Sequence, residues 1–109
     1  MYEEKTLSIY AVLFNETNKN WTWNVRTNLM FIGAVEIKCN ELLEKHGKLY
    51  LNDVYEMLGF PNTEVGNYVG WIRDNEYGDG YVSIDIADFR NFKLNFALDF
   101  NVDGDIRGY

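Results

Sequence analysis

The feature that most constrains the fold is the strict alternation of side chains between residues 94 and 102. Large apolar residues occupy every second position, and smaller or polar residues stand between them. Successive side chains of a strand point to opposite faces, so the pattern predicts a β-strand with one buried and one solvent-exposed face. Residues 81–86 repeat the pattern, and Asp85 and Asp99 fall on the expected exposed side. This favours an antiparallel sheet whose wet face is acidic.

Glycine-containing turn signals separate the strands of the second half. Gly78-Asp79-Gly80 predicts a turn between a strand over residues 68–73 and the strand over 81–86. Asp103-Gly104 predicts a two-residue hairpin turn that follows the alternating segment. At least three strands are therefore expected after residue 60.

Two further segments near the N-terminus are rich in strand-forming residues. Residues 6–14 are largely apolar, residues 21–25 alternate, and the polar run 15–20 would join them as a hairpin loop. Trp21 and Trp23 would then share one side of the second strand. If that side is exposed, they are candidate anchors of a protein interface.

Helical periodicity dominates the middle of the chain. Apolar residues recur at three- and four-residue spacing from about Asn28 to Lys45, and Gly47 is placed to end this helix. Asn52 can cap a short second helix over residues 53–58, which Gly59 can close. Together the elements predict an α+β fold, with an antiparallel sheet of about five strands and one long and one short helix packed on one face.

Length and composition indicate one folded domain that spans residues 1–109. The apolar fraction of 47% is typical of a packed globular chain, and 109 residues are too few for two independent cores. No segment approaches the roughly 20 apolar residues of a membrane span. The lone Cys39 has no partner for an internal disulfide, which is compatible with a reducing compartment. We expect a soluble cytoplasmic protein.

The net charge is confined to the second half of the chain. Residues 1–51 hold six acidic and six basic side chains, whereas residues 52–109 hold eleven acidic and four basic ones, which accounts for the formal charge of −7. A one-sided negative field attracts cationic partners and repels nucleic acid and anionic surfaces. The pattern favours a binding protein, without direct contact to nucleic acid or membrane.

A calcium site was considered at residues 99–105, because Asp99, Asn101, Asp103 and Asp105 match the opening of an EF-hand loop. The match is incomplete, since a twelfth-position glutamate would fall at residue 110 and the flanking segments read as strands. We favour the hairpin turn, and a calcium-binding module remains an alternative. Zinc is disfavoured by one cysteine and one histidine, so no metal and no cofactor are expected.

Catalytic patterns are equally weak. Cys39 and His46 are seven residues apart, which places them about 10 Å apart along one helix and too far for proton transfer. Cys39 is expected in the core. Glu36-Ile37-Lys38 resembles the Glu-x-Lys element of restriction-type nucleases, but it lacks an upstream aspartate and falls in a predicted helix. We expect no enzymatic activity.

Several short motifs of the second half resemble an uncharacterised domain of phages and mobile elements in Gram-positive bacteria. The motifs are Leu51-Asn-Asp-Val-Tyr55, Leu58-Gly59, Gly70-Trp71, Gly80-Tyr-Val82 and Leu98-Asp-Phe-Asn-Val-Asp-Gly104. The resemblance brings no catalytic assignment. It implies that the gene lies among phage genes, and small phage proteins include acidic inhibitors of bacterial defence enzymes.

Charge and resemblance together predict a non-catalytic inhibitor of a host nucleic-acid-processing enzyme, of the anti-CRISPR or anti-restriction type. Alternate residues of a strand are about 6.8 Å apart, so carboxylates from residue 99 to 105 could mimic successive phosphates in a basic groove. A phage structural or self-associating domain is the alternative. The expected partner-binding residues are Asp74, Glu76, Asp79, Asp85, Asp88, Asp99, Asp103, Asp105, Trp21 and Trp23.

Overall fold

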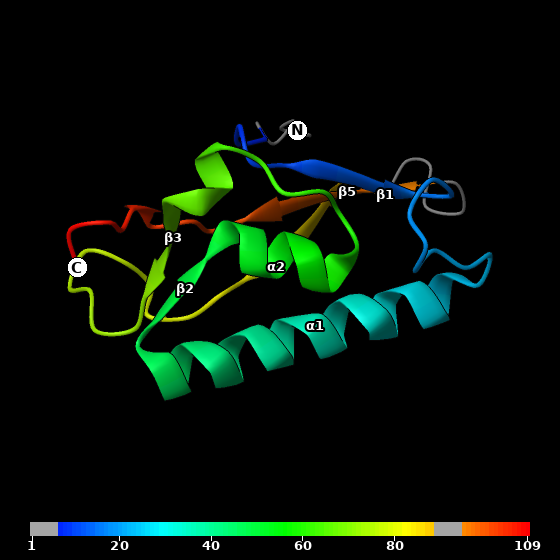
Figure 1. Cartoon of the computed structure of the whole chain (residues 1–109). Coiled ribbons are helices and arrows are strands. Elements are labelled where there is room, and N and C mark those ends of the chain that lie inside the picture. The colour runs from blue at the N-terminus through cyan, green and yellow to red at the C-terminus, as the bar shows by residue number, and fades with distance from the viewer. Residues whose placement is uncertain (1–6, 89–94) are drawn as a thin grey trace, which may run out of the picture.

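The computed structural model describes residues 7–88 and 95–109 and confirms the predicted α+β class (Figure 1). Its strands form two three-stranded antiparallel sheets, where a single sheet of about five strands was expected. In chain order the elements are β1 (Val12–Asn15), α1 (Val25–His46), β2 (Lys48–Tyr50), α2 (Leu51–Leu58), the 3₁₀ helix η1 (Val65–Asn67), β3 (Val69–Ile72), β4 (Ile84–Asp88), β5 (Asn95–Phe100) and β6 (Gly104–Asp105).

The long helix α1 starts earlier than the periodicity predicted. The side chain of Asn24 accepts a hydrogen bond from the backbone N–H of Thr27 at 2.9 Å, so the helix begins at Val25. Gly47 ends it as predicted, in the left-handed conformation with φ of 79°. The buried side of α1 is formed by Asn28, Ile32, Val35, Cys39 and Leu43.

The predicted strand over residues 21–25 is wrong, because local hydrogen bonds hold this segment against α1. The amide of the buried Asn28 accepts from the N–H and hydroxyl of Thr22 at 2.9 and 2.8 Å and donates to its carbonyl at 2.9 Å. The backbone of Thr22 is thereby paired with a helix residue instead of a strand. β1 pairs with β5, so the expected N-terminal hairpin does not form.

The short helix α2 begins at Leu51, directly after β2, and Gly59 closes it as predicted. The carboxylate of Asp53 accepts a hydrogen bond from the N–H of Tyr50 at 3.2 Å. Asn52 was expected to cap this helix but lies inside it, with only 6% of its surface exposed. Its amide instead hydrogen-bonds the backbone of Thr63 and the side chain of Asn67, so it anchors the segment that follows α2.

The two sheets divide strands that are neighbours in sequence. One sheet has the order β1-β5-β4 and the other the order β2-β3-β6. β3 and β4 therefore belong to different sheets, and the turn signal at residues 78–80 lies in a loop that crosses between them. β5 and β6 are divided in the same way, so the hairpin expected at Asp103-Gly104 is wrong; Gly104 pairs with Gly70 of β3 instead.

Both faces of β5 are covered. Phe96, Leu98 and Phe100 are buried, as the alternation predicted, but Ala97 and Asp99 on the expected wet face are also only 8% exposed. The N–H of Ser8 donates to the Asp99 carboxylate at 2.8 Å and the Ser8 hydroxyl donates to it at 2.5 Å. The expected strand starts at residues 6 and 94 lie outside the described residues.

The core is shared by the two helices and both sheets. Trp71 and Phe14 are fully buried in one continuous cluster with the apolar residues of β5. In the view of Figure 1 both helices run on the same side of β1 and β5, with α1 along the edge of the molecule. None of the helices in the described part of the chain is long and apolar enough to cross a lipid bilayer.

Candidate functional site

Two exposed tyrosines of the second half, Tyr77 and Tyr81, lie in the connection between β3 and β4. We call residues 74–81 the tyrosine loop. Tyr77 is 89% exposed and Tyr81 is 55% exposed. Folded proteins place tyrosines at interfaces because the ring supplies apolar contact area and the hydroxyl a hydrogen bond. The alternation over residues 81–86 places Tyr81 on the expected exposed side, whereas no pattern distinguishes Tyr77 from core aromatics; neither was predicted as a binding residue.

The end of the tyrosine loop is fixed by one side chain, that of Asn101. Its amide nitrogen donates to the Asp79 carboxylate and to the Tyr81 carbonyl, both at 2.9 Å. Its amide oxygen accepts from the N–H of Ser83 at 2.7 Å and from the indole N–H of Trp71 at 2.9 Å. An asparagine amide offers two donors and two acceptor lone pairs, so all four are used. The exposed loop is thus tied to Trp71, the largest fully buried side chain among the described residues.

The middle of the loop packs on Asp103. One carboxylate oxygen of Asp103 accepts from the N–H of Ile72 at 2.9 Å. Gly78 lies so close that a Cβ atom there would come within 2.5 Å of the same carboxylate. A turn precedes this contact, since Asn75 accepts from the N–H of Tyr77 at 3.0 Å through its side chain and from that of Gly78 at 3.1 Å through its carbonyl. Glycine at residue 78 is what allows the approach.

Three of the predicted acidic residues, Asp74, Glu76 and Asp79, are exposed on this loop. Asp74 forms an ion pair with Arg73 at 3.1 Å, and this carboxylate raises the pKa of Arg73 above its ordinary value. Arg73 also donates to the carbonyl of Glu44, at the end of α1. Three carboxylates against one guanidinium leave the loop and its flank negatively charged.

The predicted array of carboxylates from residue 99 to 105 does not exist. Asp99 is buried and bonded to Ser8, and β5 ends at Phe100, so the strand does not continue through the expected positions. Asp103 serves as an acceptor for the backbone of β3. Asp105 belongs to the other sheet, where the Arg107 guanidinium donates to it and holds the pKa of its carboxyl below the usual range.

The remaining acidic predictions fall around β4. Asp85 lines a hollow of about 320 Å³ with Ser83, Asp99, Phe100 and Asn101. The backbone of Asp88 ends β4, and its side chain lies outside the described residues. The described carboxylates therefore gather at the tyrosine loop and do not form a single row along β5.

The two tryptophans that were predicted as interface anchors differ in exposure. Trp21 is half-buried, and its ring packs edge-on against Phe14 and Phe96 at centroid distances of 5.4 and 5.6 Å. Trp23 is 68% exposed and meets Trp21 at 5.8 Å. Only Trp23 has the exposure expected of an interface anchor.

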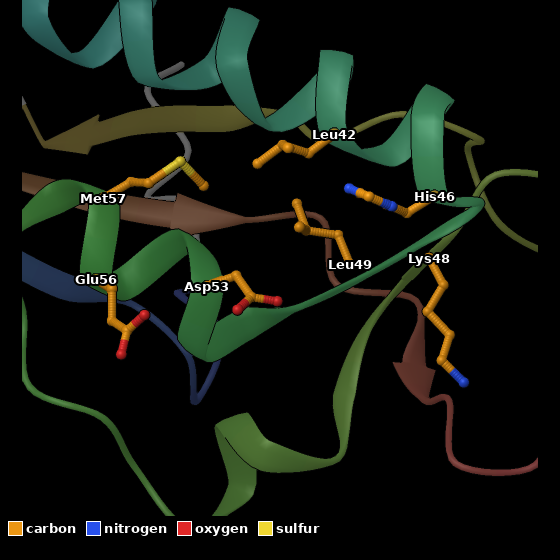
Figure 2. A pocket seen from close by; sticks show the side chains of 7 residues that line it. All are labelled: Leu42, His46, Lys48, Leu49, Asp53, Glu56 and Met57. Atoms are coloured by element: carbon orange, nitrogen blue, oxygen red, sulfur yellow. The ribbon is translucent and has the colours of Figure 1, made fainter.

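A hollow of about 600 Å³ lies between α1, β2 and α2. Figure 2 shows Leu42 and Leu49 pointing toward each other across it, with Met57 at one side and the His46 ring at the other. The side chains of Lys48 and Glu56 extend away from the leucines. Among the described residues, no hydrogen bond joins His46 to a carboxylate, so the hollow offers an apolar contact surface and no assembled acid–base pair.

Cys39 and Glu36, which the sequence offered as candidates for catalysis, contribute instead to packing and hydrogen bonding within the fold. Cys39 is fully buried, and burial together with the nearby Glu36 and Asp53 raises its pKa to about 12. Glu36 and Lys38 lie on α1 and not on a strand, and the Glu36 carboxylate accepts from the N–H of Ile84 at 2.7 Å. In residues 7–88 and 95–109, no three histidine, cysteine or acidic side chains are grouped to hold a metal ion. The oxygens expected to open a calcium loop bind N–H and O–H donors instead.

A family described as of unknown function, DUF6353, matches residues 1–109. The match covers the whole chain and gives a family, but it does not show the phage origin that the motifs of the second half suggested. No curated protein and no solved structure shows significant similarity to the chain.

Proposed function

For a chain that belongs to the DUF6353 family, we propose a non-catalytic binding function in which the tyrosine loop engages a basic surface of another protein. One observation carries the proposal. Two tyrosines that are 89% and 55% exposed stand among three exposed carboxylates on a loop fixed to the core through Asn101.

Preorganisation favours binding through this loop. A loop that is already ordered loses less conformational entropy on association than a flexible one. Tyrosine adds large contact area with few rotatable bonds, which is why it is frequent in protein-binding loops. The hydrogen bonds from Asn101 and the close packing of Gly78 on Asp103 hold the loop before any partner arrives.

Charge determines the class of partner. The second half of the chain carries the entire net charge of −7, so approach to a basic surface is accelerated and approach to nucleic acid is opposed. Basic grooves are typical of enzymes that hold DNA or RNA. We therefore take the partner to be a nucleic-acid-processing enzyme of bacterial defence, and the protein to be its phage-borne inhibitor acting in the host cytoplasm. With the carboxylates of β5 buried, inhibition would come from the loop and not from a strand-like phosphate mimic.

The test compares charge reversals inside and outside the loop. The loop variant combines Asp74→Lys with Glu76→Lys, which leaves the Asp79–Asn101 hydrogen bond intact. The control combines Glu16→Lys with Glu64→Lys, which makes the same change of charge at exposed sites elsewhere. Immobilised wild-type protein is expected to capture a basic, nucleic-acid-binding host protein that duplex DNA or raised salt releases.

The loop variant should lose at least tenfold in affinity for the captured protein, and the control should lose much less. A second variant, Tyr77→Ser with Tyr81→Ser, removes the aromatic contacts without altering charge. Equal binding by the wild type and both loop variants would refute the proposal. Capture of a partner that neither DNA nor salt displaces would refute the basic-groove part of it.

A further inference from the structure

The outward side of α1 carries an apolar stripe that residues 7–88 and 95–109 leave exposed. Met30 is 66% exposed and Ile37 is 64% exposed, and Gly33 and Ala34 between them are also exposed. Residues three, four and seven apart share one face of a helix, so these four form a continuous stripe. Figure 1 shows α1 along the edge of the molecule, with the rest of the fold on one side of it.

The stripe lies directly opposite the buried side of α1. At 100° per residue, Met30 and Ile37 point about 140–180° away from Val35 and Cys39, which are buried. Solvent-facing helix positions are ordinarily filled by charged or polar residues. An apolar surface at this place indicates a contact outside the chain.

Gly33 supports the same conclusion independently. Glycine weakens the interior of a helix because it has no side chain to restrict the unfolded backbone. Packing within the chain does not require it, since a Cβ atom at residue 33 would meet nothing within 4 Å. Small residues at the centre of a helix face allow the backbone of a second helix to approach closely.

We propose that a second copy of the chain occupies this stripe, with the two α1 helices antiparallel about a two-fold axis that passes between Gly33 and Ala34. In this arrangement residue i of one copy faces residue 67 − i of the other. Met30 then faces Ile37, and Gly33 faces Ala34. The same surface serves both copies, as two-fold symmetry requires.

Charge complementarity identifies the second copy as the occupant. The same symmetry places Arg26 of one copy opposite Glu41 of the other, at both ends of the stripe. Arg26 is exposed, and the only ion pair of Glu41 among the described residues is a loose one of 3.9 Å to Lys38, with both side chains more than half exposed. Each dimer thus gains two ion pairs, and no like charges face each other at the apolar centre of the stripe.

A single helix from each copy makes a small interface, so the dimer is expected to be reversible. Interfaces below about 1,200 Å² of total buried area are typical of weak complexes. We therefore expect a monomer–dimer equilibrium with a dissociation constant in roughly the micromolar range. The tyrosine loop is on another part of the chain, so this proposal and the proposed function stand or fall separately.

The decisive experiment is a charge swap measured by sedimentation velocity over a concentration series. Arg26→Glu alone and Glu41→Arg alone should each weaken dimerisation at least tenfold, because each sets like charges against one another. The double variant should restore dimerisation, since the pairs re-form with reversed sign. Lys19→Glu, which makes the same charge change as Arg26→Glu at an exposed loop position, should leave it unchanged.

Disulfide trapping tests the orientation of the helices. Ala34→Cys lies next to the two-fold axis and should cross-link two copies on mild oxidation, whereas Met30→Cys should not cross-link with itself. The native Cys39 is fully buried and will not interfere. A parallel arrangement would instead cross-link both variants.

The proposal would be refuted if the full chain stayed monomeric at all concentrations up to about a hundred times the expected micromolar dissociation constant. Dimerisation that survives Gly33→Arg would also refute it, because an arginine cannot fit a close helix contact. Circular dichroism of Gly33→Arg should match the wild type, since the position has open space around it. If a monomeric chain loses binding of another protein on Gly33→Arg, the stripe serves that partner and self-association is wrong.

Discussion

The indole N–H of Trp71 donates a hydrogen bond to the side-chain oxygen of Asn101 at 2.9 Å, which links the core to the tyrosine loop. Trp71 is fully buried, so its N–H has no access to water if Asn101 is removed. A buried donor without an acceptor costs about 1–3 kcal/mol. Four hydrogen bonds of one half-buried amide therefore determine both the stability and the shape of the loop.

Asn101→Ala is predicted to lower the free energy of unfolding by about 2–3 kcal/mol, because the Trp71 donor and the Ser83 N–H both lose their acceptor. Urea denaturation followed by tryptophan fluorescence measures the change. Asn62→Ala is the control, since Asn62 is exposed and makes one side-chain hydrogen bond of 3.2 Å to Glu56. If both variants lost the same small amount of stability, Asn101 would not be the anchor described above.

Ser8→Ala should destabilise the protein by about 1–2 kcal/mol and Asp99→Ala by more, since the carboxylate accepts from both the hydroxyl and the N–H of Ser8. The larger loss should be accompanied by faster proteolysis near residue 8, because the segment before β1 loses its attachment to β5. Pulse proteolysis with mass spectrometry of the fragments would detect the new cleavage site. Unchanged cleavage in Asp99→Ala would contradict this role.

Alkaline pH should destabilise the fold from about pH 9 upward. Burial raises the pKa of Cys39 from 9.0 to about 12, so above pH 9 the unfolded chain releases this proton while the folded protein keeps it. The unfolded state then binds fewer protons, and the free energy of unfolding falls by up to about 1.4 kcal/mol per pH unit until about pH 12. Tyr55, whose pKa burial raises from 10.0 to about 12, adds a second decline above pH 10.

Cys39→Ala separates the two contributions, because it removes the decline that begins near pH 9 and retains the one that begins near pH 10. Urea unfolding at pH 8, 9, 10 and 11 gives the comparison. A wild-type stability that is level from pH 8 to 11 would show that the thiol is accessible to solvent.

Two glycine substitutions should have opposite effects on stability. Gly33→Ala should raise the free energy of unfolding of the dilute monomer by about 0.5–1 kcal/mol, because alanine favours the helix and the new methyl group meets nothing within 4 Å. Gly70→Ala should lower it by several kcal/mol, roughly as severe overpacking does, because a Cβ there would come within 2.0 Å of the Leu49 carbonyl oxygen. Thermal melts at low protein concentration measure both. Destabilisation by Gly33→Ala in the monomer would mean that the position is packed within the chain.

The helices and the buried side of β5 were predictable because their patterns depend on local geometry alone. The spacing of Ile32, Val35 and Cys39 predicts a helix whatever surrounds it, and alternation predicts that Phe96 and Leu98 share a face. The fate of the other face was not predictable. Asp99 is hydrogen-bonded to Ser8, which lies 91 positions away in the sequence, and no pattern of neighbouring residues predicts such a contact.

The division of the strands into two sheets could not be predicted from the sequence either. Strand formers at residues 68–73 and 81–86 predict strands, but pairing depends on which edges they meet, and each joins a different sheet. Of the candidate site, the acidic residues of the loop were predicted from charge. The outward position of Tyr81 follows from the alternation over residues 81–86, and its exposure confirms it. The exposure of Tyr77 was not predictable, since that tyrosine lies outside any alternating or helical pattern.

The pairing of β1 with β5 affects how the chain is made. Val12 lies opposite Leu98, so β1 cannot pair with β5 until the ribosome has added more than eighty further residues. During that interval Phe14, which ends fully buried, lacks its contact with Phe96 of β5. Completion of the sheet β1-β5-β4 is consequently a late event in synthesis, and until then the backbone of β1 has no strand partner from this sheet.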